Sequence, residues 1–223
     1  MRRLPTRTAL AAALAAAGLT LVMSGCGADD DQASAATPTT SVTPTTGVTG
    51  SAQPTSGGAA AGSVDVVLRD VGGAVVGVVR LTPAAGAVRV EGRFHGLTPG
   101  GYHGFHIHQK PICDPKAPGG AFSTAGAHYN PGGTHHGEHA GDLPPLLVDK
   151  DGTAEIITQS DRFTLDDLRK GGVALIVHAE PDNLAHIPDR YQASGAPSPG
   201  PDEKTNATGD AGDRIACGVL AKS

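Results

Sequence analysis

The chain has 223 residues and a formal net charge of −5, and 39% of its residues are hydrophobic. This acidic balance argues against nucleic acid as a partner, because binding to phosphates requires a clustered basic surface. After a leader and a linker, residues 63–223 have the length of one domain.

The first 26 residues have the pattern of an export signal. Three arginines among the first seven residues precede an apolar run over 9–22, which is shorter than the about 20 residues of a membrane-spanning helix. The run leads into MSGC, so residues 1–26 are predicted to be a lipoprotein-type signal peptide with Cys26 as the lipidated residue. The protein would be exported and lipid-anchored to the cell membrane, facing the periplasm or the extracellular side. An ordinary secretory signal, cleaved nearby, is the alternative.

Residues 27–62 are rich in Thr, Ser, Pro, Gly and Ala and contain no aromatic residue. Such a segment buries too little apolar surface to offset the entropy lost on ordering. It is therefore predicted to be a flexible linker between the leader and the folded domain.

The cysteines agree with export. If Cys26 carries lipid, Cys113 and Cys217 remain of the three cysteines, and an even pair in an exported protein predicts a disulfide. A pair of free thiols is the alternative, which export disfavours.

Short runs of alternating apolar and polar residues predict eight strands in the domain. They cover about 63–69, 74–81, 87–95, 101–108, 145–149, 153–160, 173–178 and 215–220. Residues 150–152 are typical of a hairpin turn, and residues 164–170 predict a short helical turn capped by Thr164. The segments 109–144 and 179–214 carry no strand pattern, and loops of this length are usually functional. The fold class is therefore all-β, an eight-stranded Greek-key β-barrel or sandwich with two long functional loops.

Seven histidines and one aspartate form the most informative pattern of the chain: His106, His108, His128, His135, His136, His139 and His178, with Asp142. His106 and His108 are two residues apart, so on a strand both imidazoles point to one face. His178 ends another strand that could reach the same point. Clustered imidazoles with one carboxylate favour copper or zinc over calcium or magnesium. Taken singly, these residues have simpler interpretations, as partly exposed strand ends or a nonspecific metal-binding tract.

Five separated motifs follow one another along the domain. They are GYHGFHIH (101–108), STAGAHYNP (123–131), HAGDLPPLLVDKDGTAE (139–155), VHAEPDNL (177–184) and TGDAGDRIACGVL (208–220). In this order the chain resembles the copper,zinc superoxide dismutases, in their bacterial exported (lipoprotein) branch, over roughly residues 63–221. The combination of several ordered motifs makes the resemblance specific.

The resemblance implies a ligand set for each metal. Copper would be bound by His106, His108, His128 and His178. Zinc would be bound by His128, His136, His139 and Asp142, with His135 as the alternative to His136. In this arrangement His128 bridges the two metals.

The resemblance also implies roles for residues around the metals. Asp182 would tie a copper histidine to a zinc histidine. Arg214 would stand beside the copper, with Thr208 on the opposite wall of the channel. His103 matches a structural histidine behind the site and is not expected to be a ligand.

The implied reaction is the dismutation of superoxide to dioxygen and hydrogen peroxide, which would protect the cell envelope from extracellular superoxide. Copper and zinc are the expected cofactors, and only copper cycles between two oxidation states. Arg214 and His128 would be the catalytic residues, since Arg214 docks the anion and His128 carries a proton. The oligomeric state, monomer or homodimer, stays open.

Two other functions are considered. One is a copper-only dismutase that lacks zinc, because His135 and His136 are only four and three residues before His139, and the family spacer is longer. The other is a non-catalytic copper-binding lipoprotein. Arg214, Thr208 and Asp182 argue against the second, because storage of copper requires none of them.

Overall fold

The structure is a computed structural model that describes residues 62–223. The predicted signal peptide, its Cys26 and the linker up to residue 61 lie outside the described residues. Within residues 62–223 the strands are β1 (Val64–Asp70), β2 (Val75–Ala84), β3 (Ala87–Phe94), β4 (Gly101–His103), β5 (Phe105–His108), β6 (Leu146–Val148), β7 (Ala154–Ser160), β8 (Val173–His178) and β9 (Arg214–Leu220). The helices of this region are η1 (Ser123–Ala125), α1 (Leu165–Gly171) and α2 (Glu203–Thr208). None of them is long and apolar enough to cross a membrane.

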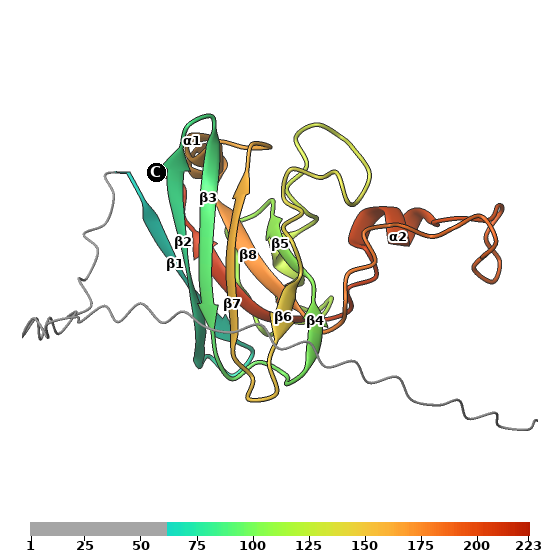
Figure 1. The fold of residues 1–223 in the computed structure, drawn as a ribbon, viewed down its shortest axis with the longest axis horizontal. Helices are drawn as coiled ribbons and strands as arrows, with labels where there is room; N and C mark the ends of the chain where they lie inside the picture. Colours follow the sequence, from blue (N-terminus) through green and yellow to red (C-terminus); the bar gives the residue numbers. More distant parts are fainter. Residues whose placement is uncertain (1–61) are drawn as a thin grey trace, which may run out of the picture. The chain divides into compact units, whose positions relative to one another are not determined.

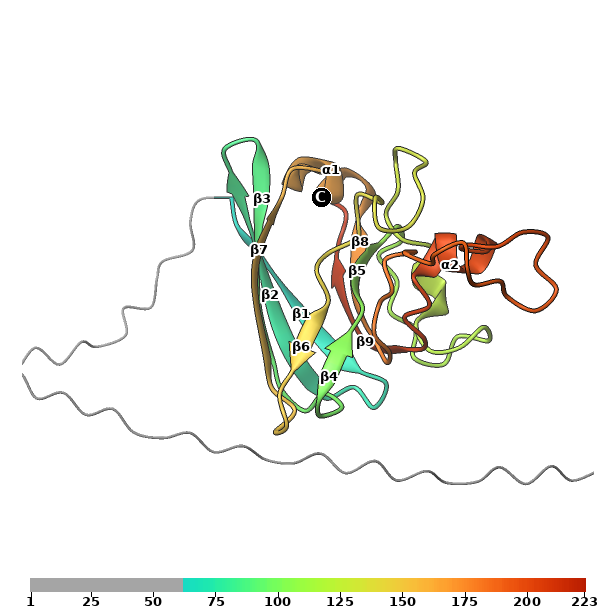
Figure 2. The same cartoon turned by 45° about the vertical axis from the view of Figure 1, so that its right-hand side comes forward.

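The strands form a large curled sheet and a small one (Figure 1). The large sheet has the order β5-β8-β9-β1-β2-β3-β7, and β4 pairs with β6 in the small sheet. All of these pairs are antiparallel. Figure 2 shows β6 and β4 between β7 and β5, the two edges of the large sheet. The predicted all-β barrel or sandwich is confirmed.

The expectation of eight strands is wrong for the described residues, because the predicted strand 101–108 is two strands, β4 and β5. The chain changes from the small sheet to the large one at Gly104. A side chain at Gly104 would place a Cβ 2.6 Å from the Cβ of Ala211. The glycine therefore lets the backbone pass close to the segment before β9, and the interruption also aims β5 at the metal-ligand region.

The core follows from the alternation of the strands. In β3, for example, every second residue from Val88 to Phe94 is buried, and Arg89, Glu91 and Arg93 between them are more exposed. The ring of Phe94 meets that of Phe105 edge to face, with centroids 5.7 Å apart. Strands packed in this way provide a rigid platform for β5 and β8, which carry candidate ligands.

The expected helical turn at 164–170 is confirmed as α1. The Thr164 side chain accepts a hydrogen bond from the Asp167 N–H at 3.1 Å, and the Asp167 carboxylate accepts from the Thr164 backbone N–H at 3.4 Å in return. This reciprocal capping satisfies two free donors at the start of the helix. Leu165 and Leu168 are buried and fasten α1 to the barrel.

The two long segments lie on the same side of the barrel (Figures 1 and 2). The segment 179–214 contains α2, which the sequence analysis did not predict. Asp202 caps α2 by accepting from the Thr205 N–H at 2.9 Å, and Gly209 ends it with a φ of 60°. An Asp before the helix and a Gly after it are the usual signals of helix ends. The helix is only six residues long, which is why its periodicity was too short to detect.

The predicted disulfide between Cys113 and Cys217 is confirmed. It joins the segment 109–144 to β9 across a sequence separation of 104 residues. In the chain-entropy account, closing a loop of this length stabilises the fold by about 4–5 kcal/mol. The bond also fixes the start of the long segment next to the strand that begins with Arg214.

Candidate metal centre

Four histidines from three parts of the chain bring one nitrogen each to a common point. They are His106 and His108 from β5, His178 from β8 and His128 from the segment 109–144. These four nitrogens lie within 4.8 Å of one another, and all four side chains are buried. β5 and β8 are hydrogen-bonded neighbours, and His128 forms an isolated β-bridge with His108. The fold therefore collects the histidines that the sequence analysis grouped.

The hydrogen bonds of His108 and His178 define which ring nitrogens carry protons. Nδ1 of His108 donates to the Gly126 carbonyl at 3.0 Å, and Nδ1 of His178 donates to the Gly212 carbonyl at 3.1 Å. A carbonyl only accepts, so in each neutral ring Nε2 has no proton. These two Nε2 atoms face each other at 3.4 Å. Two opposed lone pairs at this distance suit a shared metal ion.

His106 has a buried ring nitrogen that forms no hydrogen bond. Its Nε2 donates to Asp182 Oδ2 at 2.7 Å, which leaves Nδ1 without a proton. Within residues 62–223, only this Nδ1 and the Thr124 hydroxyl are buried side-chain polar atoms that lack a hydrogen-bond partner. A buried nitrogen without a partner is costly. The donor set of imidazole nitrogens fits copper.

A second group lies on the other side of His128, around its Nδ1 atom. Asp142 Oδ1 is 2.9 Å from this atom, and Nδ1 of His136 and of His139 are 3.2 and 3.3 Å from it. Both Nδ1 atoms are also 3.3 Å from Asp142 Oδ1. In a tetrahedron with bonds of about 2.0 Å the ligands are about 3.3 Å apart. The donor set and its spacing therefore fit zinc.

His106 also lies within 4.8 Å of the atoms of this second group. Its Nε2 is engaged by Asp182, however, and its free Nδ1 belongs to the first group. His139 is the better fourth member, because its Nδ1 is 3.3 Å from both His128 Nδ1 and Asp142 Oδ1.

The structure brings His136 into the second group and leaves His135 outside. His136 is 4% exposed, whereas His135 is exposed on the rim of a cleft of ≈ 580 Å³. The backbone N–H of His136 donates to the Asn206 carbonyl of α2 at 2.9 Å. Gly137, with a φ of 89°, then turns the chain so that its N–H donates to Asp142 at 2.7 Å. The short spacing before His139 is thus accommodated by a tight turn.

Asp182 connects the two groups. Its fully buried carboxylate accepts from His106 Nε2 at 2.7 Å and from His136 Nε2 at 2.8 Å. Burial opposes the charge, but these hydrogen bonds outweigh it and hold the pKa of Asp182 below its usual range. Gly209 packs directly over the contact, and a Cβ there would collide with Asp182 and His136. The carboxylate therefore orients a ring in each group.

The protonation of the two groups differs. Burial lowers the pKa of His106 to about 4 and that of His178 to about 3, so both rings are neutral at physiological pH, as metal ligands must be. Burial acts on His136 too, but its hydrogen bonds to the carboxylates of Asp142 and Asp182 overcome it and raise its pKa to about 9. Near two carboxylates a positive charge is favoured, and a zinc ion would replace the proton in that position.

Comparison with known proteins identifies the family. The family model described as copper/zinc superoxide dismutase (SODC) matches residues 75–220, more than half of the chain. The chain belongs to the copper/zinc superoxide dismutase family.

Individual relatives agree with the family assignment. The Superoxide dismutase [Cu-Zn] of Mycolicibacterium paratuberculosis is 42% identical over 189 residues, covering 77% of this chain and 82% of the relative. That of Mycobacterium bovis is 51% identical over 133 residues, 56% of this chain and 54% of the relative. The crystal structure of the Cu/Zn superoxide dismutase from Brucella abortus has a TM-score of 0.53 and 31% identity, covering 71% of this chain and 99% of that one.

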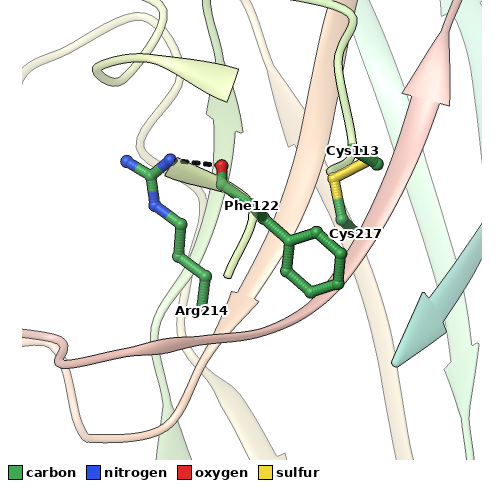
Figure 3. The surroundings of a disulfide bond; sticks show 4 residues. All are labelled: Cys113, Phe122, Arg214 and Cys217. Atoms are coloured by element: carbon green, nitrogen blue, oxygen red, sulfur yellow. Dashed lines mark hydrogen bonds between the residues drawn. A yellow bond between two sulfur atoms is a disulfide. The ribbon is translucent and has the colours of Figure 1, made fainter. Parts of the chain in front are cut away.

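Within this dismutase fold Arg214 is held by two backbone carbonyls, and Figure 3 shows the hydrogen bond to the one from Phe122. Its Nη1 donates to Phe122 at 2.7 Å and its Nη2 donates to Gly126 at 2.6 Å. The Gly126 carbonyl also accepts from His108, so one atom orients both the guanidinium and a histidine of the first group. Burial is the main cause that lowers the pKa of His108 and of His178, and the nearby positive charge of Arg214 lowers both further.

Two other residues singled out in the sequence have different positions. His103 is buried, and its Nδ1 donates to the backbone carbonyl of His178 at 2.7 Å, so it supports β8 from behind. Thr208 is half-buried at the end of α2, where its hydroxyl donates to the Lys204 carbonyl at 2.9 Å.

Sequence reasoning missed the residues that act through their backbone. The carbonyls of Phe122, Gly126 and Gly212 orient Arg214, His108 and His178. Any residue type supplies a carbonyl, so no sequence signal marks them. Phe122 has a φ of 58°, which a non-glycine residue adopts only when its surroundings hold it there.

Proposed function

We propose that this chain catalyses the dismutation of superoxide to dioxygen and hydrogen peroxide, with copper bound by His106, His108, His128 and His178. The observation that carries the proposal is the free, buried Nδ1 of His106 beside the opposed Nε2 atoms of His108 and His178. The relatives named Superoxide dismutase [Cu-Zn] support it. Copper, when bound, supplies the reversible one-electron exchange that both halves of the reaction need.

Arg214 and His128 are proposed as the catalytic residues. The two carbonyls that hold Arg214 fix the direction of a permanently charged guanidinium, which binds and orients the anionic substrate. The Nδ1 atom of His128 belongs to the second group, so its Nε2 is the atom offered to the first. That Nε2 is proposed to take up a proton and release it to the product. Thr208 is proposed as the opposite wall of the channel.

Zinc is proposed to be bound by His128, His136, His139 and Asp142. The near-tetrahedral spacing of the four ligand atoms favours this over a copper-only dismutase. Zinc has no redox chemistry, so when bound by these residues it would serve to fix the His128 ring through its Nδ1 atom. Asp182 then links the two sites through His106 and His136.

Metal analysis of the purified protein tests this function. Protein matured with copper and zinc is expected to contain near one zinc per copper and to consume superoxide, whereas protein loaded with zinc alone is expected to be inactive. Full copper and full activity with essentially no zinc would make it a copper-only dismutase. Copper uptake without superoxide consumption would instead indicate a copper-holding protein.

Arg214→Ala is expected to lower the dismutation rate at least tenfold, about 1.4 kcal/mol of transition-state stabilisation, while the copper content stays unchanged. Arg214→Lys is expected to recover part of the rate, because it restores the charge but not the planar fork. Rates measured at equal copper content check this, with the exposed Arg93→Ala as the matched control. A rate equal to that of the parent at low ionic strength would assign anion docking to another residue.

The place of action is proposed from the N-terminal sequence. A positive start, an apolar run and small residues before Cys26 support export and lipid attachment at that cysteine. Residues 27–62 would then link the dismutase domain to the membrane surface. The disulfide agrees with an oxidising compartment. The enzyme would remove superoxide at the cell envelope.

A further inference from the structure

The side chain of Arg162 forms hydrogen bonds with the turn that carries the proposed zinc ligands. Nη1 of Arg162 donates to the backbone carbonyls of both Gly137 and His139, each at 3.2 Å. Arg162 lies two residues after the end of β7, and the next residue, Phe163, is buried in the core. The contact therefore joins a rigid part of the barrel to the segment 136–139.

The two sides of this turn have opposite polarity. The N–H groups of Gly137 and His139 both donate to Asp142 Oδ2, at 2.7 and 3.1 Å. Their carbonyls are the ones that face Arg162. A carboxylate thus stabilises the N–H side of the turn and a guanidinium its carbonyl side, and hydrogen bonds to charged groups are the stronger ones.

No acidic partner accounts for the position of Arg162. None of the ion pairs formed within residues 62–223 includes it. The hydrogen bonds that its guanidinium forms in this region go to the Gly137 and His139 carbonyls. The side chain is therefore used for the turn and not for a surface salt bridge.

We propose that Arg162 is a positioning residue for zinc, which holds the turn 136–139 in the conformation that aims His136, His139 and Asp142 at one point. The inference rests on the proposed zinc site. His136 and His139 are three residues apart, and the chain forms a turn that begins at residues 136–137. Gly137 at a φ of 89° permits this turn without enforcing it. The hydrogen bonds from Arg162 to the carbonyls of Gly137 and His139 hold the turn in this conformation.

The test compares Arg162→Gln and Arg162→Lys with Arg93→Gln, which removes the same charge from an exposed ion pair with Glu155. Zinc affinity is measured by competition with a chelator, and the geometry by the visible spectrum of the cobalt(II)-substituted site. Arg162→Gln is expected to weaken zinc binding about tenfold and to change the cobalt spectrum. Arg162→Lys is expected to recover part of the affinity, and Arg93→Gln to match the parent.

Hydrogen exchange provides a second measurement that does not depend on metal. In the metal-free protein, the amides of residues 136–142 are expected to exchange faster in Arg162→Gln than in the parent, while those of β2 and β3 are unchanged. Zinc affinity within twofold of the parent together with an unaltered cobalt spectrum would overturn the role of Arg162 alone. A parent that takes up neither zinc nor cobalt would overturn the proposed zinc site and this role with it. Neither result would touch the dismutation proposed for copper, which is measured separately.

Discussion

His106→Ala and His178→Ala are each expected to reduce superoxide dismutation at least a hundredfold. Each change removes one of four nitrogen donors from the first group and opens the geometry around the metal. His106→Ala also leaves Asp182 without one of the three N–H donors that compensate its buried charge, the other two being the His136 ring and the Leu184 backbone. His178→Ala has no such effect on Asp182, and it isolates the loss of a ligand. Dismutation rates should be measured at equal copper content, together with the copper spectrum.

His95→Ala is the matched control, because His95 is exposed and lies outside both groups. It should keep the rate and the spectrum of the parent. Activity within a few-fold of the parent in both ligand variants, at equal copper content, would refute the copper assignment.

Asp182→Asn is expected to lower zinc affinity by about tenfold to a hundredfold, the usual effect of losing a partner that orients a metal ligand. The carboxylate accepts from an N–H on each side, whereas an amide turns its NH₂ group toward one of the two rings. A donor would then face a donor, and His106 or His136 would rotate away from its metal. Chelator competition for zinc and copper, with hydrogen exchange of both segments, measures the effect.

Asp166→Asn serves as the control for Asp182→Asn, because it removes the same charge from a side chain that is 80% exposed on α1. It should bind both metals as the parent does. If Asp182→Asn kept the parent's affinity for zinc and for copper, the link between the two groups would be dispensable, and each group would have to be positioned by its own loop.

The spacing of the short loop illustrates how far a sequence pattern can be interpreted. His135 and His136 are equally good candidates in sequence, since both precede His139 by about one helical turn. The choice depends on contacts from a distant segment. Asn206 accepts the His136 N–H, Asp182 engages its ring, and Gly209 leaves space for both. None of these residues is near the loop in sequence.

The strand prediction failed at one place for a similar reason. Residues 101–108 alternate like one strand, but the chain changes sheets at Gly104, where it passes Ala211. A local pattern reports which face of a strand is buried, and it does not report which sheet the strand joins. The helix α2 was missed because six residues provide less than two turns of periodicity.

By itself the sequence determined the all-β class, the short helix capped by Thr164, the cysteine pair and the set of candidate ligands. The first three follow from local alternation, capping and cysteine number. The ligand set follows from the two-residue spacing of His106 and His108 together with the ordered motifs through which the chain resembles the copper,zinc superoxide dismutases. None of these signals needs knowledge of distant contacts. Only the tertiary structure decided that His136 joins the second group. It also decided that the carbonyls of Phe122 and Gly126 hold Arg214, and that Arg162 donates to the carbonyls of the turn 136–139. Those choices depend on backbone carbonyls and on close approaches between segments far apart in the chain. Every residue type has a backbone carbonyl, so these contacts cannot be inferred from the residue types in the sequence.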